Sequence, residues 1–432
     1  MKNRILIFLL IAFAWVPELF SQKILTLREC YDLAMNANAL AGEKEAYSII
    51  SGLNDANLSK SRLPTVDAGA TILYNSSVVD MKSVLGEIPI PGIAELIKPL
   101  PHEQYKITVD INQVIYDGGI VRNSRLLEKA DLGVNQKQTE SDLYKLRAQI
   151  NACYFSLLLI DRQKELLVNY LVLIEKRITA MQSALLNNMI IKSDIDVMTS
   201  EKLKLQQQIK ENETMKISLM KVLSDLTGAE ISHTTAFIVP SMPNPSDNEL
   251  SRPELELLDL RKDQLSAGLK LIESKRMPRA FGFATLGYGN PPGNNFFKNE
   301  FEPYFVVGAS LKWNILDWNR AKNEKHIVAL RQGILENRKN DLSDAIKRQL
   351  ETKNAEIENL KSMIGTDTIL IELRKSITSS SESQYNNGTI TATELLNQIN
   401  SEKQAVISYE IHKINLAMSR VEYLNISGKE IE

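Results

Sequence analysis

The chain has 432 residues, of which 44% are hydrophobic, 24% charged and 6% aromatic, and its formal net charge is −2 at pH 7. This balance favours neither a disordered polyelectrolyte nor a nucleic-acid-binding protein. The two cysteines and four scattered histidines provide no ligand pair at the spacing of a structural metal site, so we expect no metal and no cofactor.

The N-terminus carries the pattern of a signal peptide over residues 1–21. Lys2 and Arg4 precede an apolar run over 5–16, and the small residue Ser21 lies near the expected cleavage site. An N-terminal membrane anchor is the alternative interpretation. No later stretch has about 18 apolar residues, so no membrane-spanning helix is expected to follow. The remaining destinations are the periplasm, the outer membrane and the medium.

The rest of the chain contains one pattern twice. Asp117 in "QVIYDGG" falls opposite Asp317 in "WNILDW", and Gly228 in "LSDLTG" falls opposite Gly428 in "LNISG". A segment rich in Pro, Ser and Asn separates the two copies and has the composition of a linker. The predicted parts are a first repeat over 22–228, a linker over 229–253 and a second repeat over 254–432.

Each repeat contains two segments in which apolar and polar residues alternate. A lipid-facing barrel strand gives this alternation, and so does a strand of a half-exposed soluble sheet. The predicted strands cover about 64–79, 104–117, 279–289 and 303–317. Four strands are too few to close into a barrel, so a membrane location would require three chains to share a twelve-stranded barrel.

Long helical segments follow the strands. Apolar residues recur at alternating steps of three and four from Leu143 to Leu185, with Lys164 as the polar exception, which predicts a coiled-coil seam. The predicted long helices cover about 119–186, 194–226, 320–385 and 392–425. A continuous helix of about 66 residues would be about 100 Å long, so we expect these helices to build a tube or a stalk.

Short breaks interrupt the helical pattern at matching places in the two repeats. In "NNGTITATELL" the "NNG" sequence can end one helix, Thr391 or Thr393 can cap the next, and Glu394 lies in its first turn. In the first repeat the expected caps are Ser193 and Asp194. Both breaks are therefore predicted to reverse the chain.

A turn is expected where each repeat passes from its second strand into a long helix. Gly118 and Gly119 can form a tight turn, Trp318 takes the place of the first of them in the second repeat, and Asp117 and Asp317 can cap the helices. "DGGIVR" lacks the pattern of a phosphate-binding loop. The aromatic residues predicted at membrane interfaces are Trp313, Trp318, Tyr116 and Tyr304.

The order and spacing of these segments resemble those of the TolC-like outer membrane efflux proteins over essentially the whole mature chain. "LTLRECYDLAMNANAL" and "YNNGTITATELL" also carry the resemblance. It implies a mainly α fold with a β-barrel contribution, in which a trimeric twelve-stranded barrel in the outer membrane is continued by an α-helical tunnel across the periplasm. It further implies a homotrimer without catalytic residues that contacts outer membrane lipid, a periplasmic adaptor and an inner membrane pump of the RND or ABC type.

In this family the helix reversals are periplasmic tips that constrict the tunnel and contact the adaptor. Glu394 falls where an acidic residue lines the constriction, Asn397 takes a second position that is acidic in the best-known members, and Tyr385 matches the loop pattern. The basic loop residue of those members is Ile390 here. The residues implied at the tips and in adaptor docking are Asn188, Met189, Lys192, Ser193, Asp194, Asp196, Asn387, Gly388, Thr389 and Ile390.

Three questions stay open from the sequence. Three Glu394 carboxylates near one axis would attract cations and raise one another's pKa, whereas Glu394 in a single chain could simply stabilise the first turn of its helix. Lys192, Asp194 and Asp196 could replace the missing basic link between hairpins. For the whole chain, the alternative to an export channel is a periplasmic coiled-coil scaffold or adaptor whose strands form a soluble sheet.

Overall fold

The computed structural model describes residues 24–79, 100–187, 189–241, 250–295 and 298–431. The predicted signal peptide, 1–21, lies outside these residues. The chain divides into two compact units. The first unit contains the described residues of 1–42, 139–255 and 340–432, and the second contains those of 43–138 and 256–339.

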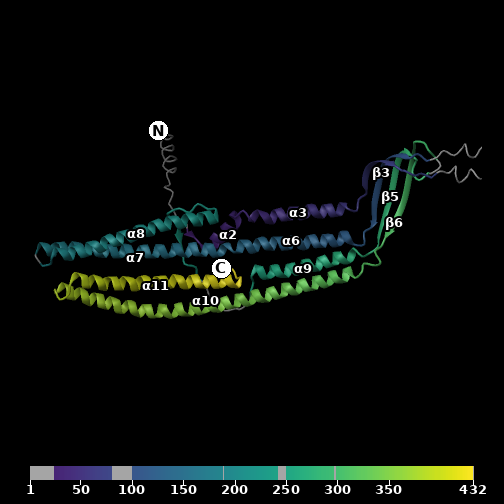
Figure 1. Cartoon of the computed structure of the whole chain (residues 1–432). Coiled ribbons are helices and arrows are strands. Elements are labelled where there is room, and N and C mark those ends of the chain that lie inside the picture. The colour runs from purple at the N-terminus through teal and green to yellow at the C-terminus, as the bar shows by residue number, and fades with distance from the viewer. Residues whose placement is uncertain (1–23, 80–99, 188, 242–249, 296–297, 432) are drawn as a thin grey trace, which may run out of the picture. The chain divides into compact units, whose positions relative to one another are not determined.

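The elements alternate between strands and long helices in each half of the chain (Figure 1). In chain order they are β1 (Ile24–Leu25), α2 (Leu27–Ala37), α3 (Ala41–Lys60), β2 (Thr65–Tyr74), β3 (Glu103–Tyr116), α6 (Ile120–Tyr144), α7 (Leu146–Leu186), α8 (Lys192–Thr227), β4 (Ala236–Phe237), α9 (Pro253–Ser274), β5 (Arg279–Asn290), β6 (Glu302–Lys312), α10 (Arg320–Asn386) and α11 (Ala392–Ser427).

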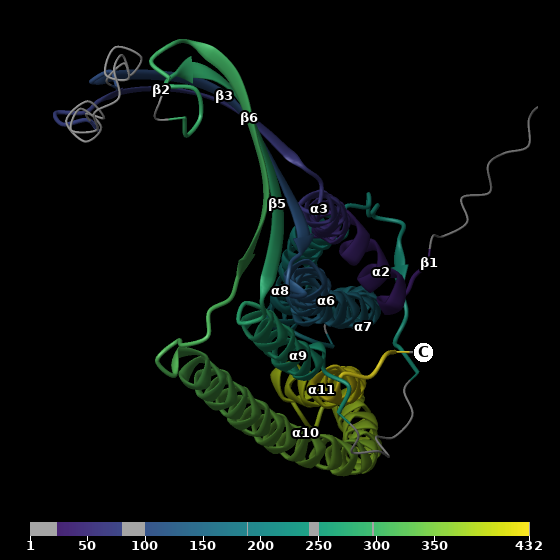
Figure 2. The same cartoon turned by 90° about the vertical axis from the view of Figure 1, so that its right-hand side faces the viewer.

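The second unit contains a four-stranded antiparallel sheet in the order β2-β3-β5-β6, whose strands are the curved arrows in Figure 2. Two of the predicted strands, 64–79 and 303–317, extend five residues too far at their C-terminal ends. Tyr74 pairs with Glu103, the first residue of β3, and Lys312 pairs with Arg279, the first residue of β5. Each strand therefore ends where its partner begins, because no further ladder hydrogen bonds are available there.

The register places apolar side chains on one face of the sheet. Between the pair Ile72–Tyr105 and the pair Val66–Ile111, this face has no charged residue in the four described strands. Its apolar members are Val66, Ala68, Ala70, Ile72, Tyr105, Ile107, Val109, Ile111, Ala284, Leu286, Tyr288, Pro303, Phe305 and Val307. Many of them are open to solvent in the single chain, including Ile72 at 78% and Val307 at 74% exposure.

The opposite face is mixed: it carries the charged residues Asp67, Lys106, Asp110 and Lys312, and also Phe283 and Val306. Tyr304 also lies on this face, because it pairs with Gly287 and its ring fills the space that a Cβ of Gly287 would occupy. The side chain of Tyr304 therefore does not lie on the apolar face, and its place at a membrane interface stays a prediction.

The first unit contains two pairs of long helices, α7 with α8 and the part of α10 from Asn340 onward with α11. The predicted helices 320–385 and 392–425 agree closely with α10, which has 67 residues, and α11. The predicted continuous helix 119–186 is wrong at Lys145, where α6 ends and α7 begins. Next to this break the Tyr144 hydroxyl donates to Asn425 O at 2.6 Å, and the Arg147 guanidinium lies 4.6 Å from the Tyr144 ring.

The predicted linker 229–253 contains a short strand, so its assignment as mere linker is wrong over β4. Ala236 and Phe237 pair in parallel with Ile24 and Leu25 of β1. The buried Tyr154 hydroxyl lies 3.0 Å from Leu25 O and accepts Ile238 N at 3.2 Å. A buried phenol needs such polar partners, and here they join both chain segments to α7. Residues 242–249 lie outside the description.

Within the described residues, the first unit has three apolar cores along its helices. One surrounds Tyr154, Phe155 and Leu157 of α7 and includes residues of α2, α8 and α11. A second joins α10 to α11 and consists of Ile346, Leu350, Ile357 and Tyr423. The third lies toward the helix reversals and is called the tip core below. None of the helices within the described ranges combines the length and the apolar composition needed to cross a membrane.

Candidate gate and docking tips

The two helix reversals end their first helices in the same way. At the second tip Gly388 has φ +71°, its N–H donates to Tyr385 O at 2.9 Å, and Thr389 N donates to Gln384 O at 2.9 Å. At the first tip Met189 N donates to Ala184 O at 2.9 Å, again across five residues. This bond closes a Schellman-type helix end and satisfies carbonyls that the helix leaves without a partner.

The helices that leave the tips are both stabilised by an acid at the third helical position. Thr391 Oγ1 accepts Glu394 N at 3.2 Å, and Glu394 Oε2 accepts Thr391 N at 2.8 Å, which is a complete capping box. At the first tip Asp194 Oδ2 accepts Ile191 N at 3.4 Å. The predicted cap role of Ser193 is wrong, because α8 already begins at Lys192 and Ser193 lies inside its first turn.

Glu394 thus stabilises the first turn of α11, which is one of the two roles that the sequence left open for it. Its carboxylate accepts the Thr391 N–H and hydroxyl, and these bonds hold the pKa of Glu394 below its usual range. Glu394 and Asn397 are both exposed and lie one turn apart on α11, whereas Leu395 and Leu396 between them are buried. This side of α11 is therefore the side available to line a passage.

Tyr385 and Ile390 contact the tip core rather than projecting freely from the loop. The tip core consists of Leu167, Ile174, Met181, Met198, Leu205, Ala392, Leu395, Leu396 and Ile399. Burial raises the pKa of Tyr385, and the nearby Asp194 raises it further, while Arg177 lowers it. Its buried hydroxyl has no hydrogen-bond partner among the described residues.

The outermost residues differ in character between the tips. At the first tip Leu186 is 85% exposed, Met189 75% and Ile191 66%, and at the second tip Asn387, Gly388 and Thr389 are exposed. The remaining predicted docking residues Lys192, Ser193 and Asp196 are also exposed. Asn188 lies outside the described residues. Lys192 forms no ion pair within the described parts of this chain.

Two ion pairs that the sequence did not predict join helices behind the tips. Lys403 Nζ of α11 lies 2.8 Å from Glu201 Oε1 of α8, with side chains only 11% and 7% exposed. Arg177 of α7 lies 3.0 Å from Glu382 of α10. Stepping by three and four along α11 through the buried Ile399 reaches Lys403, so a charged residue on an apolar seam was the available signal.

The strand-to-helix junctions confirm the predicted caps. Asp117 Oδ2 accepts Val121 N at 2.7 Å, and Asp317 Oδ2 accepts Ala321 N at 3.2 Å. Gly118 and Gly119 have φ values of +68° and +87°. Trp318 in the second junction also has a positive φ, +52°, which is uncommon for a bulky residue.

No family model and no curated protein matches the sequence. Solved structures do match over almost the whole chain. The outer membrane channel CmeC of Campylobacter jejuni shares 13% identity at a TM-score of 0.64, with 93% of this chain and 85% of that chain covered.

Two further outer membrane proteins match equally well. VceC of Vibrio cholerae shares 11% identity at a TM-score of 0.66, covering 94% of this chain and 97% of that one. The open state of the MtrE channel of Neisseria gonorrhoeae shares 15% identity at a TM-score of 0.66, covering 94% and 89%. The TolC-like fold expected from the sequence, mainly helical with long hairpins and an antiparallel sheet, is therefore confirmed.

Proposed function

We propose that three copies of this chain form an export channel of the outer membrane. The four strands of each copy contribute to a twelve-stranded barrel, and the long helices continue it as a tunnel into the periplasm. Substrates reach the tunnel from an inner membrane pump of the RND or ABC type through a periplasmic adaptor.

The single observation that carries this proposal is the sheet of the second unit. One face is apolar and open to solvent in the single chain, and the two outer strands, β2 and β6, each have one unpaired edge within the described sheet. Lipid would cover the apolar face, but a sheet in lipid must not leave backbone groups without hydrogen bonds. Closure with further copies removes both edges at once.

The strand directions fit such a closure. Each neighbouring pair in the order β2-β3-β5-β6 is antiparallel, so β2 and β6 run in opposite directions. The β6 edge of one copy can therefore pair with the β2 edge of the next in antiparallel fashion. Three copies give three times four strands, above the eight strands at which single-chain barrels begin.

The long helices also have an exposed apolar surface that could pack against another copy of the chain. Leu370, Leu373 and Ile377 of α10 recur at steps of three and four and are 39%, 57% and 43% exposed. An apolar seam of this spacing is what a long helix presents to a partner helix. We assign this partner to a second copy within the tunnel wall.

The tips support docking and gating. The exposed Leu186, Met189 and Ile191 at the first tip offer an apolar contact to the adaptor, and the polar second tip offers hydrogen bonds. Glu394 and Asn397 then line the narrowest part of the tunnel in three copies, where the carboxylates attract cations. Opening separates the tip helices in an iris-like movement.

The alternative function is a periplasmic scaffold or adaptor with a soluble sheet. The apolar face argues against it, since Phe305 at 73% and Ile107 at 63% exposure would remain in water next to many similar neighbours. A protein recovered as a soluble monomer from the periplasm would establish the scaffold and end the channel proposal.

Planar bilayer recordings test the channel and its gate together. The purified protein is expected to form a trimer with single-channel conductance, and Glu394→Gln is expected to lower cation selectivity and block by trivalent cations. Glu372→Gln, an exposed acid of α10 away from the tip, is the matched control and should leave both unchanged. An unchanged reversal potential and unchanged block in Glu394→Gln would remove Glu394 from the constriction.

A further inference from the structure

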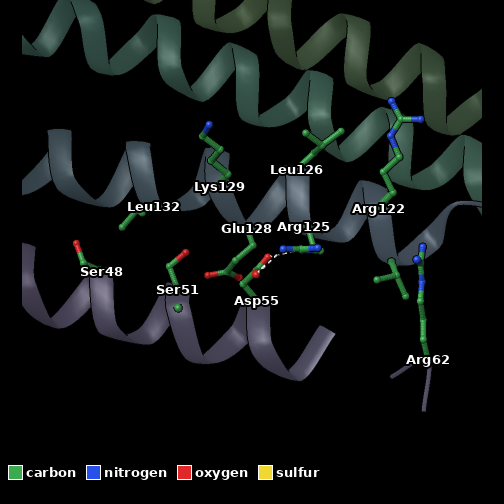
Figure 3. Close-up of a pocket in the computed structure, with 12 residues that line it drawn as sticks. Ser48, Ser51, Asp55, Arg62, Arg122, Arg125, Leu126, Glu128, Lys129 and Leu132 are labelled. Carbon is green, nitrogen blue, oxygen red and sulfur yellow. Dashed lines mark hydrogen bonds and ion pairs between the residues drawn. The ribbon is translucent and has the colours of Figure 1, made fainter. Parts of the chain in front are cut away.

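Two grooves with the same chemistry lie beside the ends of the strands in the second unit. The first, between α3 and α6, is drawn in Figure 3 and measures about 750 Å³. The second lies beside the junction of β6 with α10 and measures about 410 Å³. They occupy equivalent places in the two repeats, because Arg62 precedes β2 by three residues and Arg276 precedes β5 by three.

Each groove contains four cationic and two anionic side chains. The first has Arg62, Arg122, Arg125 and Lys129 with Asp55 and Glu128, and the second has Lys275, Arg276, Arg320 and Arg331 with Asp317 and Glu324. Four minus two gives a net charge of +2 in each groove, whereas the whole chain has −2. The lining of each groove is therefore positive although the chain as a whole is slightly negative.

Part of this charge is compensated by neighbours, and part is not. Arg125 Nη2 donates to Asp55 Oδ2 at 2.7 Å, as Figure 3 shows, and Arg320 Nε lies 3.2 Å from Glu324. Arg62 lies 3.8 Å from Asp117, and its counterpart Arg276 lies 3.3 Å from Asp317.

The remaining cations are available to a ligand. Arg122, Lys129, Lys275 and Arg331 form no ion pair among the described residues. Figure 3 shows Arg62 and Arg122 at the same end of the first groove, beyond the Arg125–Asp55 pair, with their guanidinium groups apart and that of Arg122 pointing away from α3. Two uncompensated cations per groove attract an anion.

Apolar side chains complete both grooves. Val121, Leu126 and Leu132 line the first, and Ile272, Ile327 and Val328 line the second. A ligand that matches such a lining has an anionic head and an apolar body. An inorganic anion would use only the cations, and a neutral lipid only the apolar part.

We propose that the two grooves bind anionic phospholipids of the inner leaflet of the outer membrane, with the phosphate headgroup on the cations and an acyl chain along the apolar lining. This inference rests on the proposed outer membrane barrel, which places the strand-to-helix junctions at the depth of the inner headgroups. Basic side chains near that depth attract anionic lipids. A trimer has six such sites, two grooves in each of three copies.

The test measures lipids retained by the trimer. Purified protein is reconstituted into vesicles of phosphatidylethanolamine and phosphatidylglycerol, or of phosphatidylcholine, then extracted and weighed by native mass spectrometry. The groove variant combines Arg122→Gln, Lys129→Gln, Lys275→Gln and Arg331→Gln, which spares the Asp117 and Asp317 pairs. The matched control combines Lys176→Gln, Lys204→Gln, Lys210→Gln and Lys221→Gln, which are exposed positions in the first unit.

The wild type and the control are expected to retain up to six phosphatidylglycerol molecules per trimer, and the groove variant is expected to bind them at least about ten-fold more weakly. The pair Arg122→Gln and Lys129→Gln should halve the number retained, which keeps the test valid if the larger variant does not fold. Equal retention by variant and control, or equal retention of phosphatidylcholine, would overturn the lipid sites.

Trimer mass and conductance are recorded on the same wild-type sample. If the wild type forms no trimer, the proposed channel itself fails. If the trimer conducts but retains no anionic lipid selectively, only the lipid sites fail.

Discussion

Gly118 and Gly119 in the first junction, and Trp318 and Asn319 in the second, all have positive φ values, between +52° and +87°. Before each pair stands an aspartate that accepts the N–H four residues later. The two repeats thus share the backbone turn and its acidic cap, although the residues in the turn differ. A non-glycine pair in the left-handed region is strained, so the second junction is less stable locally than the first.

The two tips also share a backbone arrangement, but here the second repeat has the more favourable residues. Both second helices begin with an acid that accepts the N–H of the capping residue, Asp194 at 3.4 Å and Glu394 at 2.8 Å. Thr391 adds a side-chain oxygen, whereas Ile191 has none. The second tip therefore has the better cap, and the first has more exposed apolar surface.

The largest expected effect on stability comes from the ion pair that joins the two repeats of one chain, between Glu201 of the first repeat and Lys403 of the second. Lys403→Met leaves the buried Glu201 carboxylate without its partner, which should destabilise the protein by about 3 to 5 kcal/mol. Urea unfolding followed by circular dichroism measures this. The double variant Glu201→Leu with Lys403→Met should recover most of the loss, and a double variant as unstable as the single one would contradict this account.

The next largest effect on stability is expected at the two strand-to-helix junctions. In Gly118→Ala the new Cβ would lie 2.8 Å from Met277 Cβ at a φ of +68°, so we expect a loss of stability on the order of 2 kcal/mol. Trp318→Gly should instead stabilise its junction by about 1 kcal/mol, because glycine adopts positive φ without strain. Thermal unfolding of both variants gives the comparison, and a destabilising Trp318→Gly would show that the indole packs in a way that outweighs the strain.

Substitutions at the N-terminal caps of α11 and α8 should change stability by smaller amounts and in opposite directions. Thr391→Ala removes the side-chain acceptor for Glu394 N and should cost about 1 kcal/mol. Ile191→Thr supplies the missing acceptor at the first tip and should gain about half of that. Hydrogen exchange of the first turns of α8 and α11 measures both changes, and equal protection before and after either substitution would contradict the difference between the tips.

The smallest effect concerns pH. The hydrogen bond from Lys353 and that from Ser419 hold the pKa of Glu356 below its ordinary value of 4.5, against the effect of burial. A lowered carboxyl pKa contributes stability above pH 4.5 that is lost as the pH falls through the lowered value. Glu356→Gln should therefore make the unfolding temperature less sensitive to acid, whereas Glu358→Gln, whose partner Lys361 is on the same exposed helix face, should not.

Periodicity was sufficient to predict most of the fold, because alternation and heptad seams arise directly from side-chain burial. The start of α11 followed from local chemistry, which left Thr391 and Thr393 as possible caps; Thr391 is the cap. The ends of β2 and β6 did not, since they depend on where the partner strands begin, and the break at Lys145 coincides with Tyr144 and Asn425, which are 281 residues apart. Non-local partners of this kind leave no trace in a short stretch of sequence.

The site was predicted less completely. The acid at Glu394 was visible, but its use in the capping box could not be separated from a role in the lumen. The ion pair of Lys403 could not be predicted, because a polar residue on an apolar seam can face either solvent or a buried partner. Its partner Glu201 lies 202 residues away in the sequence. The solvent-exposed tips gave the clearest signal, since glycine and capping residues act within a few positions.

A cysteine cross-link between the outer strands tests the central claim, that three chains share one barrel. A cysteine at Thr71 of β2 is combined in turn with one at Val306, Ser310 or Lys312 of β6. Burial raises the pKa of Cys30 to about 12 and also raises that of Cys153, so the native thiols should not interfere. Within one chain β3 and β5 separate the two edges, which puts them too far apart for a disulfide.

We expect at least one combination to give a covalent trimer on a non-reducing gel of outer membranes. Monomers in every combination, in membranes that contain the protein, would contradict the shared barrel.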